Sequence, residues 1–405
     1  MPYCDSEKSV RIFYRRYGHG STKVLLIIGL AGTHESWGPQ IKGLTGATEA
    51  NDDEAAEAAE TAARTPSGNG SEGGEADEEA QDGIEVCCFD NRGMGRSSVP
   101  SNKSDYTTTL MAKDALALLD HIGWKKAHVF GHSMGGMIAC KLTTIAPDRI
   151  SSLALLNVTG GGFECFPRID RQMLSLAFRF LRARTPEQRS VVDLETHYTK
   201  EYLDEQCGSC RRRDILYQEY VKNISSTGMQ SSIGFEGQVN ACWNHKMTSK
   251  ELERIQSSGF LISIIHGRHD VIAQVDHARN LAEKLRPVAR MVELHGAHLV
   301  SHERPDEVNQ ALRELITASI FKLKPEEWSC WSKGQTGDAG SSPTETQSST
   351  SNNNWMTSNV LTAYNFLGKI QLSFLYFLGV FVMAYEHMRG ILKIRKPARV
   401  ATSDS

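Results

Sequence analysis

The chain has 405 residues, with 45 Lys and Arg against 48 Asp and Glu, and a formal net charge of −3. Its length would hold two or three average domains, although single α/β domains often run larger than average. The basic residues are scattered and form no recognised nucleic-acid motif, so we expect no nucleic-acid partner. Nine cysteines in a chain of this size exclude a disulfide scaffold and point to a reducing compartment.

The N-terminal residues 1–18 lack a continuous apolar region, so we expect no signal peptide and no secretion. Residues 23–28 predict a strand that ends in Gly29, Leu30, Ala31 and Gly32. The two glycines suit a tight strand-to-helix turn, and they also leave backbone exposed at the end of the strand.

An insertion at residues 49–83 has a different composition, rich first in Ala and Glu and then in Ser and Gly. Residues 49–82 hold twelve acidic side chains and one base, Arg64, a net charge of −11 that leaves +8 on the remaining chain. We predict a disordered, solvated spacer here, with electrostatic docking onto the basic body as the alternative.

The sequence GHSMGG at residues 131–136 follows a short apolar run at 127–130 and precedes a helical pattern at 134–142. This order of strand, sharp turn and helix is typical of a nucleophile elbow, which would expose Ser133 at the end of its strand. The turn demands residues without side chains at Gly131 and Gly135. The G-x-S-x-G pattern alone is modest support, because glycine is frequent.

After a predicted strand at 150–158, about a hundred residues read as helices, at 171–184, 186–206, 212–224 and 249–257. Residues 159–162 are a plausible hinge for this segment. Several of its apolar residues would line a cavity or, alternatively, pack as core. These residues are Phe163, Phe166, Met173, Leu176, Phe180 and Trp243.

A serine nucleophile needs a base, and the base needs an acid that orients it. Asp270 follows an apolar strand within residues 260–270, and His298 follows the next one, which gives the order serine, acid, histidine. The rival histidines are His266, His269 and His295, and the rival acids are Glu293 and Glu303. For the oxyanion we expect the N–H groups of Met134 and Leu30.

These motifs resemble the α/β-hydrolase superfamily over residues 9–45 and 84–320. The segment FDNRGMGRS at 89–97 is similar to enol-lactonases and aminoacrylate hydrolases, with Asp90 and Arg92 as a buried pair that pins the loop. Three further segments, at 18–37, 160–168 and 266–274, resemble an uncharacterised plant group. Ile28 departs from the histidine that many relatives carry before the oxyanion glycine.

The resemblance implies a mainly parallel sheet flanked by helices, with a helical cap between late strands. The helical patterns at 107–122, 275–285 and 305–320 agree with this α/β class. We therefore divide the chain into core segments, cap, insertion, linker and anchor. The bounds are 1–48 and 84–158 for the first part of the core, 159–258 for the cap, 259–323 for the second part, 324–364 for the linker and 365–405 for the anchor.

Residues 370–385 are apolar apart from Gln371 and Ser373, and five Lys or Arg follow. We predict a membrane anchor with the enzyme facing the cytosol, the alternatives being an interfacial helix or a helix packed on the catalytic domain. Cys207 and Cys210 form a C-x-x-C outside any redox or zinc context, and Cys87, Cys88 and Cys140 fall in predicted core.

The sequence thus predicts a serine hydrolase for an ester, lactone, thioester or amide, acting on a small-molecule or lipid acyl substrate without cofactor or metal. The roles are nucleophile for Ser133, base for His298 and orienting acid for Asp270. A ligand receptor or scaffold with this fold, and an acyl transferase or C–C lyase with the same triad, are the alternatives.

Overall fold

The computed structural model describes residues 2–51, 83–165, 167, 171–183, 185–227 and 231–330. All of them belong to one compact unit, residues 1–333. Most of the acidic insertion, at 52–82, and the whole of residues 331–405, with the predicted anchor, lie outside the described residues. Among the helices of the described part, none is long and apolar enough to cross a membrane.

An eight-stranded sheet forms the centre of the unit, in the order β1-β2-β4-β3-β5-β6-β9-β10. Its strands are β1 Tyr3–Ser6, β2 Val10–Tyr17, β3 Thr22–Ile27, β4 Ile84–Phe89, β5 Ala127–His132, β6 Ile150–Leu156, β9 Ile262–Gly267 and β10 Ala289–Leu294. The pairs β1–β2 and β2–β4 are antiparallel, and every other pair is parallel. The mainly parallel sheet predicted from the sequence is confirmed.

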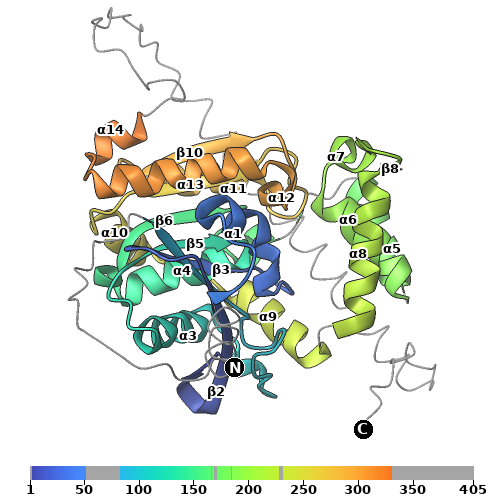
Figure 1. Ribbon diagram of the computed structural model, residues 1–405, viewed down its shortest axis with the longest axis horizontal. Coiled ribbons are helices and arrows are strands. Elements are labelled where there is room, and N and C mark those ends of the chain that lie inside the picture. Colours follow the sequence, from blue (N-terminus) through green and yellow to red (C-terminus); the bar gives the residue numbers. More distant parts are fainter. Residues whose placement is uncertain are drawn as a thin grey trace, which may run out of the picture. The chain divides into compact units, whose positions relative to one another are not determined.

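Helices cover both faces of the sheet, which explains why every residue of β5 and β9 is buried. Successive residues of β5 alternate between two cores, with Val129 in one and Phe130 in the other. One core is completed by α3 Thr108–His121, α4 Met134–Ile145, α10 Ser249–Gln256 and α11 Val275–Lys284, and the other by α1 Gly38–Thr45, α13 Pro305–Ile320 and α14 Pro325–Ser329 (Figure 1).

Helix α14 falls within the stretch predicted as a linker, so that boundary, placed at residue 324, is too early. Its Trp328 is fully buried, and the indole N–H donates to the carbonyl of Ile262 at 2.8 Å. A single tryptophan in a short polar segment gives no periodic pattern, which is why the sequence did not predict the docking of this helix.

The cap contains α5 Arg171–Arg182, α6 Pro186–His197, α7 Lys200–Asp204, α8 Arg212–Thr227 and α9 Ser232–Asn244. The single helix predicted at 186–206 is wrong, because the backbone is extended at Tyr198 and at Thr199. The Thr199 side chain accepts from the Tyr202 N–H and begins a new helix. A two-residue hairpin follows, with β7 Gln206–Cys207 paired to β8 Cys210–Arg211.

Helix α9 was missed because its glycines lower helix propensity. The packing requires them: a Cβ on Gly234 would overlap the backbone of Gly93, and one on Gly237 would overlap the ring of Tyr106. The same substitutions that would strengthen the local helical pattern would therefore push α9 off the core.

Both flanks of the acidic insertion contact one turn between β2 and β3. The side-chain amide of Asn51 donates to the carbonyl of Gly18 at 2.8 Å, and the N–H of Thr22 donates to that of Gly83 at 3.2 Å. The chain therefore leaves and re-enters the described fold at neighbouring points.

Candidate active site

Ser133 occupies the turn between β5 and α4 with φ 53° and ψ −120°, a strained conformation for a residue with a side chain. A Cβ at Gly131 would overlap the Gly135 carbonyl, and one at Gly135 would overlap that of Ile27. The elbow is held from the neighbouring strand, because the Ser133 N–H donates to the Leu156 carbonyl at 2.8 Å. The predicted need for glycine at both positions is thus explained by close backbone approach.

A continuous hydrogen-bonded chain joins the three side chains expected to form the triad. The Ser133 Oγ lies 3.1 Å from His298 Nε2, and His298 Nδ1 lies 2.8 Å from Asp270 Oδ2. Asp270 and His298 are buried, at 8% and 5% exposure. They come from the loops after β9 and β10, so the parallel strands deliver all three residues to one edge of the sheet.

Asp270 lies in a set of donors that favours its charged form. Burial raises the pKa of this carboxyl, but the charge and hydrogen bond of His298, the charge of His266 and the hydrogen bond from Asn157 outweigh it and lower the pKa to about 2. The N–H groups of Ile272 and Ala273 donate to Oδ1, both at 2.8 Å. The carboxylate is therefore fixed as an acceptor facing His298.

Asn157 is a residue of the site that the sequence did not single out. Its side-chain amide donates to Asp270 Oδ2 at 2.8 Å and to the Ala297 carbonyl at 3.1 Å. The residue is fully buried and has φ 48°, a conformation that Asn tolerates better than most residues. An Asn directly after a buried strand was the available signal.

The rival residues have other partners. His266 Nε2 lies 2.8 Å from the Ala273 carbonyl, and burial lowers the pKa of this imidazole. His269 and His295 contact each other, with 3.1 Å between ring nitrogens. Glu293 pairs with Arg279 at 2.7 Å, and Glu303 accepts from the Ala297 N–H at 2.8 Å.

The loop after β3 packs against the elbow, where the oxyanion donors were predicted. A Cβ at Gly29 would lie 3.0 Å from the Cβ of Ser133. Met134 begins α4, so its N–H belongs to the unsatisfied first turn of that helix. Leu30 has 36% exposure. The positions agree with the expected pair of donors, and their role stays a prediction.

The cap reaches the loop after β3 through Gln238 of α9, another residue that the sequence did not single out. Its side-chain oxygen accepts from the Ala31 N–H at 3.0 Å, and its amide donates to the Arg92 carbonyl at 3.0 Å. Gln238 is fully buried, and it ties the loops after β3 and β4 to the cap.

Asp90 and Arg92 are both buried, but they do not pair with each other as predicted. Asp90 accepts from the backbone N–H of His34 and lies 2.8 Å from the Nδ1 of that residue. The Arg92 guanidinium makes a bidentate contact with the Asp114 carboxylate, with both hydrogen bonds at 2.6 Å. The two side chains therefore anchor the loop to different elements. Their spacing in the sequence does not indicate which residues they contact.

The apolar cap residues expected to line a cavity are mostly at the surface. Phe163 and Trp243 are 61% and 44% exposed and contact each other edge to face, whereas Leu176 is buried. Phe166 lies outside the described residues. Their contribution to a substrate cavity stays a prediction.

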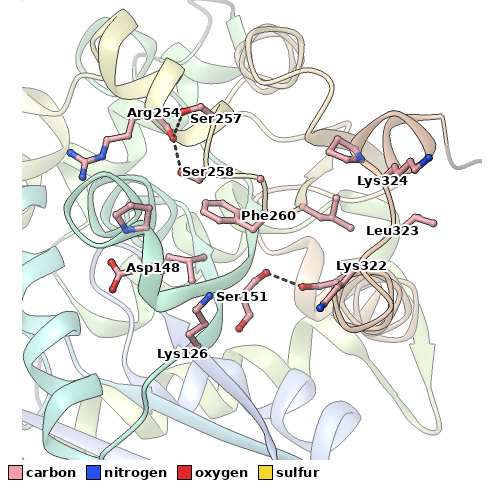
Figure 2. A pocket seen from close by; sticks show the side chains of 16 residues that line it. Lys126, Asp148, Ser151, Arg254, Ser257, Ser258, Phe260, Lys322, Leu323 and Lys324 are labelled. Carbon is pink, nitrogen blue, oxygen red and sulfur yellow. Dashed lines mark hydrogen bonds between the residues drawn. The ribbon is translucent and has the colours of Figure 1, made fainter.

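A cavity of about 830 Å³ opens at the other edge of the sheet, near the starts of β6 and β9. Figure 2 shows Lys126 and Lys322 on either side of Ser151, with Phe260 above Ser151 in the view. Ser133, Asp270 and His298 do not line this cavity. Within the described part of the chain, no group of three or more His, Cys, Asp or Glu is arranged to hold a metal ion.

The family model described as the alpha/beta hydrolase fold matches residues 67–305, more than half of the chain. The chain belongs to the α/β-hydrolase family. It is a hydrolase, and its mainly parallel sheet with flanking helices is the fold of this family. The narrower resemblance to a plant group stays a prediction.

Similar sequences and structures agree with this assignment. A putative non-heme bromoperoxidase, BpoC, of Mycobacterium tuberculosis is 27% identical over 239 residues, which cover 58% of this α/β hydrolase and 84% of the relative. A putative carbamate hydrolase, RutD, of Azorhizobium caulinodans is 24% identical over 315 residues, covering 77% and 97%. The enol-lactonase structure from Burkholderia xenovorans has a TM-score of 0.57 at 21% identity, covering 78% and 100%, and shows the fold alone.

Proposed function

We propose that this hydrolase cleaves an ester, lactone, thioester or amide through an acyl-enzyme on Ser133. The observation that carries the proposal is the hydrogen-bonded chain from Ser133 through His298 to Asp270 at a strained elbow. Two relatives support acyl chemistry: RutD is named a putative carbamate hydrolase, and a protein of Haemophilus influenzae, 24% identical over 230 residues, is named a putative esterase/lipase.

In the proposed mechanism, Ser133 Oγ attacks the carbonyl carbon of the substrate while its proton passes to His298 Nε2. The N–H groups of Leu30 and Met134 hold the oxyanion of the tetrahedral intermediate. When this intermediate collapses, the leaving group departs with the proton from Nε2. A water molecule, deprotonated by the same nitrogen, then attacks the acyl carbon and releases the acid and free Ser133.

Asp270 keeps His298 in the tautomer whose Nε2 carries no proton and faces Ser133. Because Asp270 accepts at Nδ1, the proton of the neutral imidazole stays on that nitrogen. The lowered pKa of Asp270 means that this carboxylate remains charged throughout turnover at neutral pH.

A serine-directed fluorophosphonate tests the proposal. We expect it to label the wild-type enzyme and the control variant Ser257→Ala, whose serine lies at the other edge of the sheet, but not Ser133→Ala. Equal labelling of Ser133→Ala would overturn the assignment. Hydrolysis measured with an added alcohol or amine acceptor separates a hydrolase from an acyl transferase, since only the latter diverts most product to the acceptor.

We also propose that residues 365–405 attach the enzyme to a membrane with its catalytic part in the cytosol. The support is the apolar run at 370–385 with its basic tail. Cell fractionation of the full chain and of a chain lacking 365–405 tests it. A full chain found only in the soluble fraction would contradict it.

A further inference from the structure

The loop that carries His298 is held at four backbone groups of residues 297–299 by partners from the core and from the cap. The four contacts are Ala297 N to Glu303 Oε1 at 2.8 Å, Ala297 O to Asn157 Nδ2 at 3.1 Å, His298 O to His132 Nε2 at 2.9 Å and Leu299 N to His197 O at 3.0 Å. His197 ends α6, so one of these contacts comes directly from the cap.

Glu303 joins this loop to the cap a second time. It lies at the end of α12 Val300–Glu303, is 5% exposed, and accepts from the loop through Oε1. The same oxygen accepts from the backbone N–H of Thr199 at 3.1 Å, and Oε2 accepts from the Thr199 hydroxyl at 2.6 Å. Thr199 is the corner between α6 and α7, which lies beside α12 in Figure 1.

No cation contacts Glu303 among the described residues, so its carboxylate depends on these three donors. Two of the three come from the cap corner. If that corner moved away, Oε2 would lose its hydrogen bond in a buried site, which is costly for a charged group. The resulting shift of the carboxylate would act on Ala297, directly before His298.

We propose that Glu303 is a positioning residue that couples the seating of the cap to the placement of His298. The α6–α7 corner completes the donor set of Glu303, and Glu303 in turn fixes the loop in the geometry that brings Nε2 within reach of Ser133. This inference rests on the proposed role of His298 as the base.

The experiment compares Thr199→Val, Glu303→Gln and the double variant, with Tyr202→Phe as the matched control. Thr199→Val removes the hydroxyl that donates to Glu303 and, with it, the N-cap hydrogen bond from the Tyr202 N–H. Tyr202→Phe removes a neighbouring hydroxyl that donates to the His302 carbonyl and does not contact Glu303. Hydrolysis of p-nitrophenyl acetate gives kcat and KM, and the fluorophosphonate gives a labelling rate constant. All are measured well below the melting temperature of the least stable variant.

We expect kcat and the labelling rate to fall about tenfold in Glu303→Gln and about threefold or more in Thr199→Val, with KM changed less than about twofold. The double variant should match Glu303→Gln, because both changes break one coupled unit. Tyr202→Phe should keep kcat within about twofold of wild type. If Glu303→Gln does not fold, Thr199→Val alone decides between a lowered and an unchanged kcat.

A lowered melting temperature with unchanged kcat and labelling in both single variants would overturn the inference, since it is the signature of a merely structural carboxylate. Additive losses in the double variant would also overturn it. Wild-type labelling that does not depend on Ser133 would contradict the proposed function and this inference with it, whereas Ser133-dependent labelling that no variant slows contradicts the inference alone.

Discussion

Asn157 donates to Asp270 Oδ2 at 2.8 Å, and the same carboxylate oxygen lies 2.8 Å from His298 Nδ1. One oxygen thus receives a fixed amide from the end of β6 and the imidazole of the proposed base. The amide also donates to the Ala297 carbonyl, so it constrains the acid and the histidine loop together.

Asn157→Gly should therefore lower kcat about tenfold while it keeps the positive φ accessible. Removing this hydrogen bond should also raise the pKa of Asp270 above about 2. The stability that Asp270 contributes is present above its unfolded pKa near 3.8 and is lost as pH falls towards 2. A kcat at neutral pH equal to that of wild type would contradict this role.

At the elbow, Gly135→Ala should destabilise the fold by about 3 kcal/mol or more, because the new Cβ would overlap the Ile27 carbonyl. Gly38→Ala is the control, since nothing lies within 4 Å of a Cβ there and its φ is −46°. We expect that variant to be neutral or slightly more stable. Urea unfolding measures both, and equal midpoints would show that the elbow tolerates a side chain.

Gln238 should influence catalysis from the cap, because it holds the Ala31 N–H of the loop that bears the proposed oxyanion donor. Gln238→Met keeps the length of the side chain but removes the partner of the Ala31 N–H and that of the buried Arg92 carbonyl. We expect a slower fluorophosphonate reaction, by about tenfold, at unchanged secondary structure. Val239→Ala, at a position of the same helix that is 41% exposed, should react at the wild-type rate, and a Gln238→Met rate equal to it would count against the prediction.

Buried histidines should make stability depend on pH. Burial lowers the pKa of His128 to about 4 and that of His132 and His245 to about 3, from 6.5. Below pH 6.5 these histidines bind protons in the unfolded chain but stay neutral in the folded state. The free energy of unfolding is therefore highest above pH 6.5 and declines as pH falls towards 4. Each histidine should contribute a loss of roughly 2 kcal/mol between pH 7 and pH 5.

Urea unfolding at pH 7, 6 and 5 measures this slope. His128→Gln removes one titrating group, and its slope should be shallower by about 1.4 kcal/mol per pH unit. An identical slope in wild type and variant would mean that His128 gains its proton in the folded state.

The order of elements was predictable because each parallel strand is a run of apolar residues. Such a run can be recognised in the sequence without knowing which strands lie beside it. The positions of Ser133, Asp270 and His298 followed from the same logic, since the ends of parallel strands meet at one edge. The distances among these three side chains depend on contacts between residues far apart in the chain. Local sequence patterns do not encode such contacts.

Residues that act across such distances were missed or paired wrongly. Asn157 and Gln238 are single polar side chains without a motif, and their importance lies in what folds against them. Arg92 was expected to pair with Asp90, but Asp114 on α3 supplies its partner. Helix α9 shows the converse, because tertiary packing overrides the low helix propensity of Gly234 and Gly237.

The two flanks of the acidic insertion, held at Gly18 and Thr22, have a consequence for how this chain can vary. Since the exit and return points are fixed by their own hydrogen bonds, the register of β3 against β4 does not depend on how many residues lie between them. Lengthening a loop between fixed ends costs little free energy, about 0.6 kcal/mol per doubling. This junction is thus a place where the gene can gain or lose sequence, or accept a foreign domain, while the hydrolase core keeps its shape.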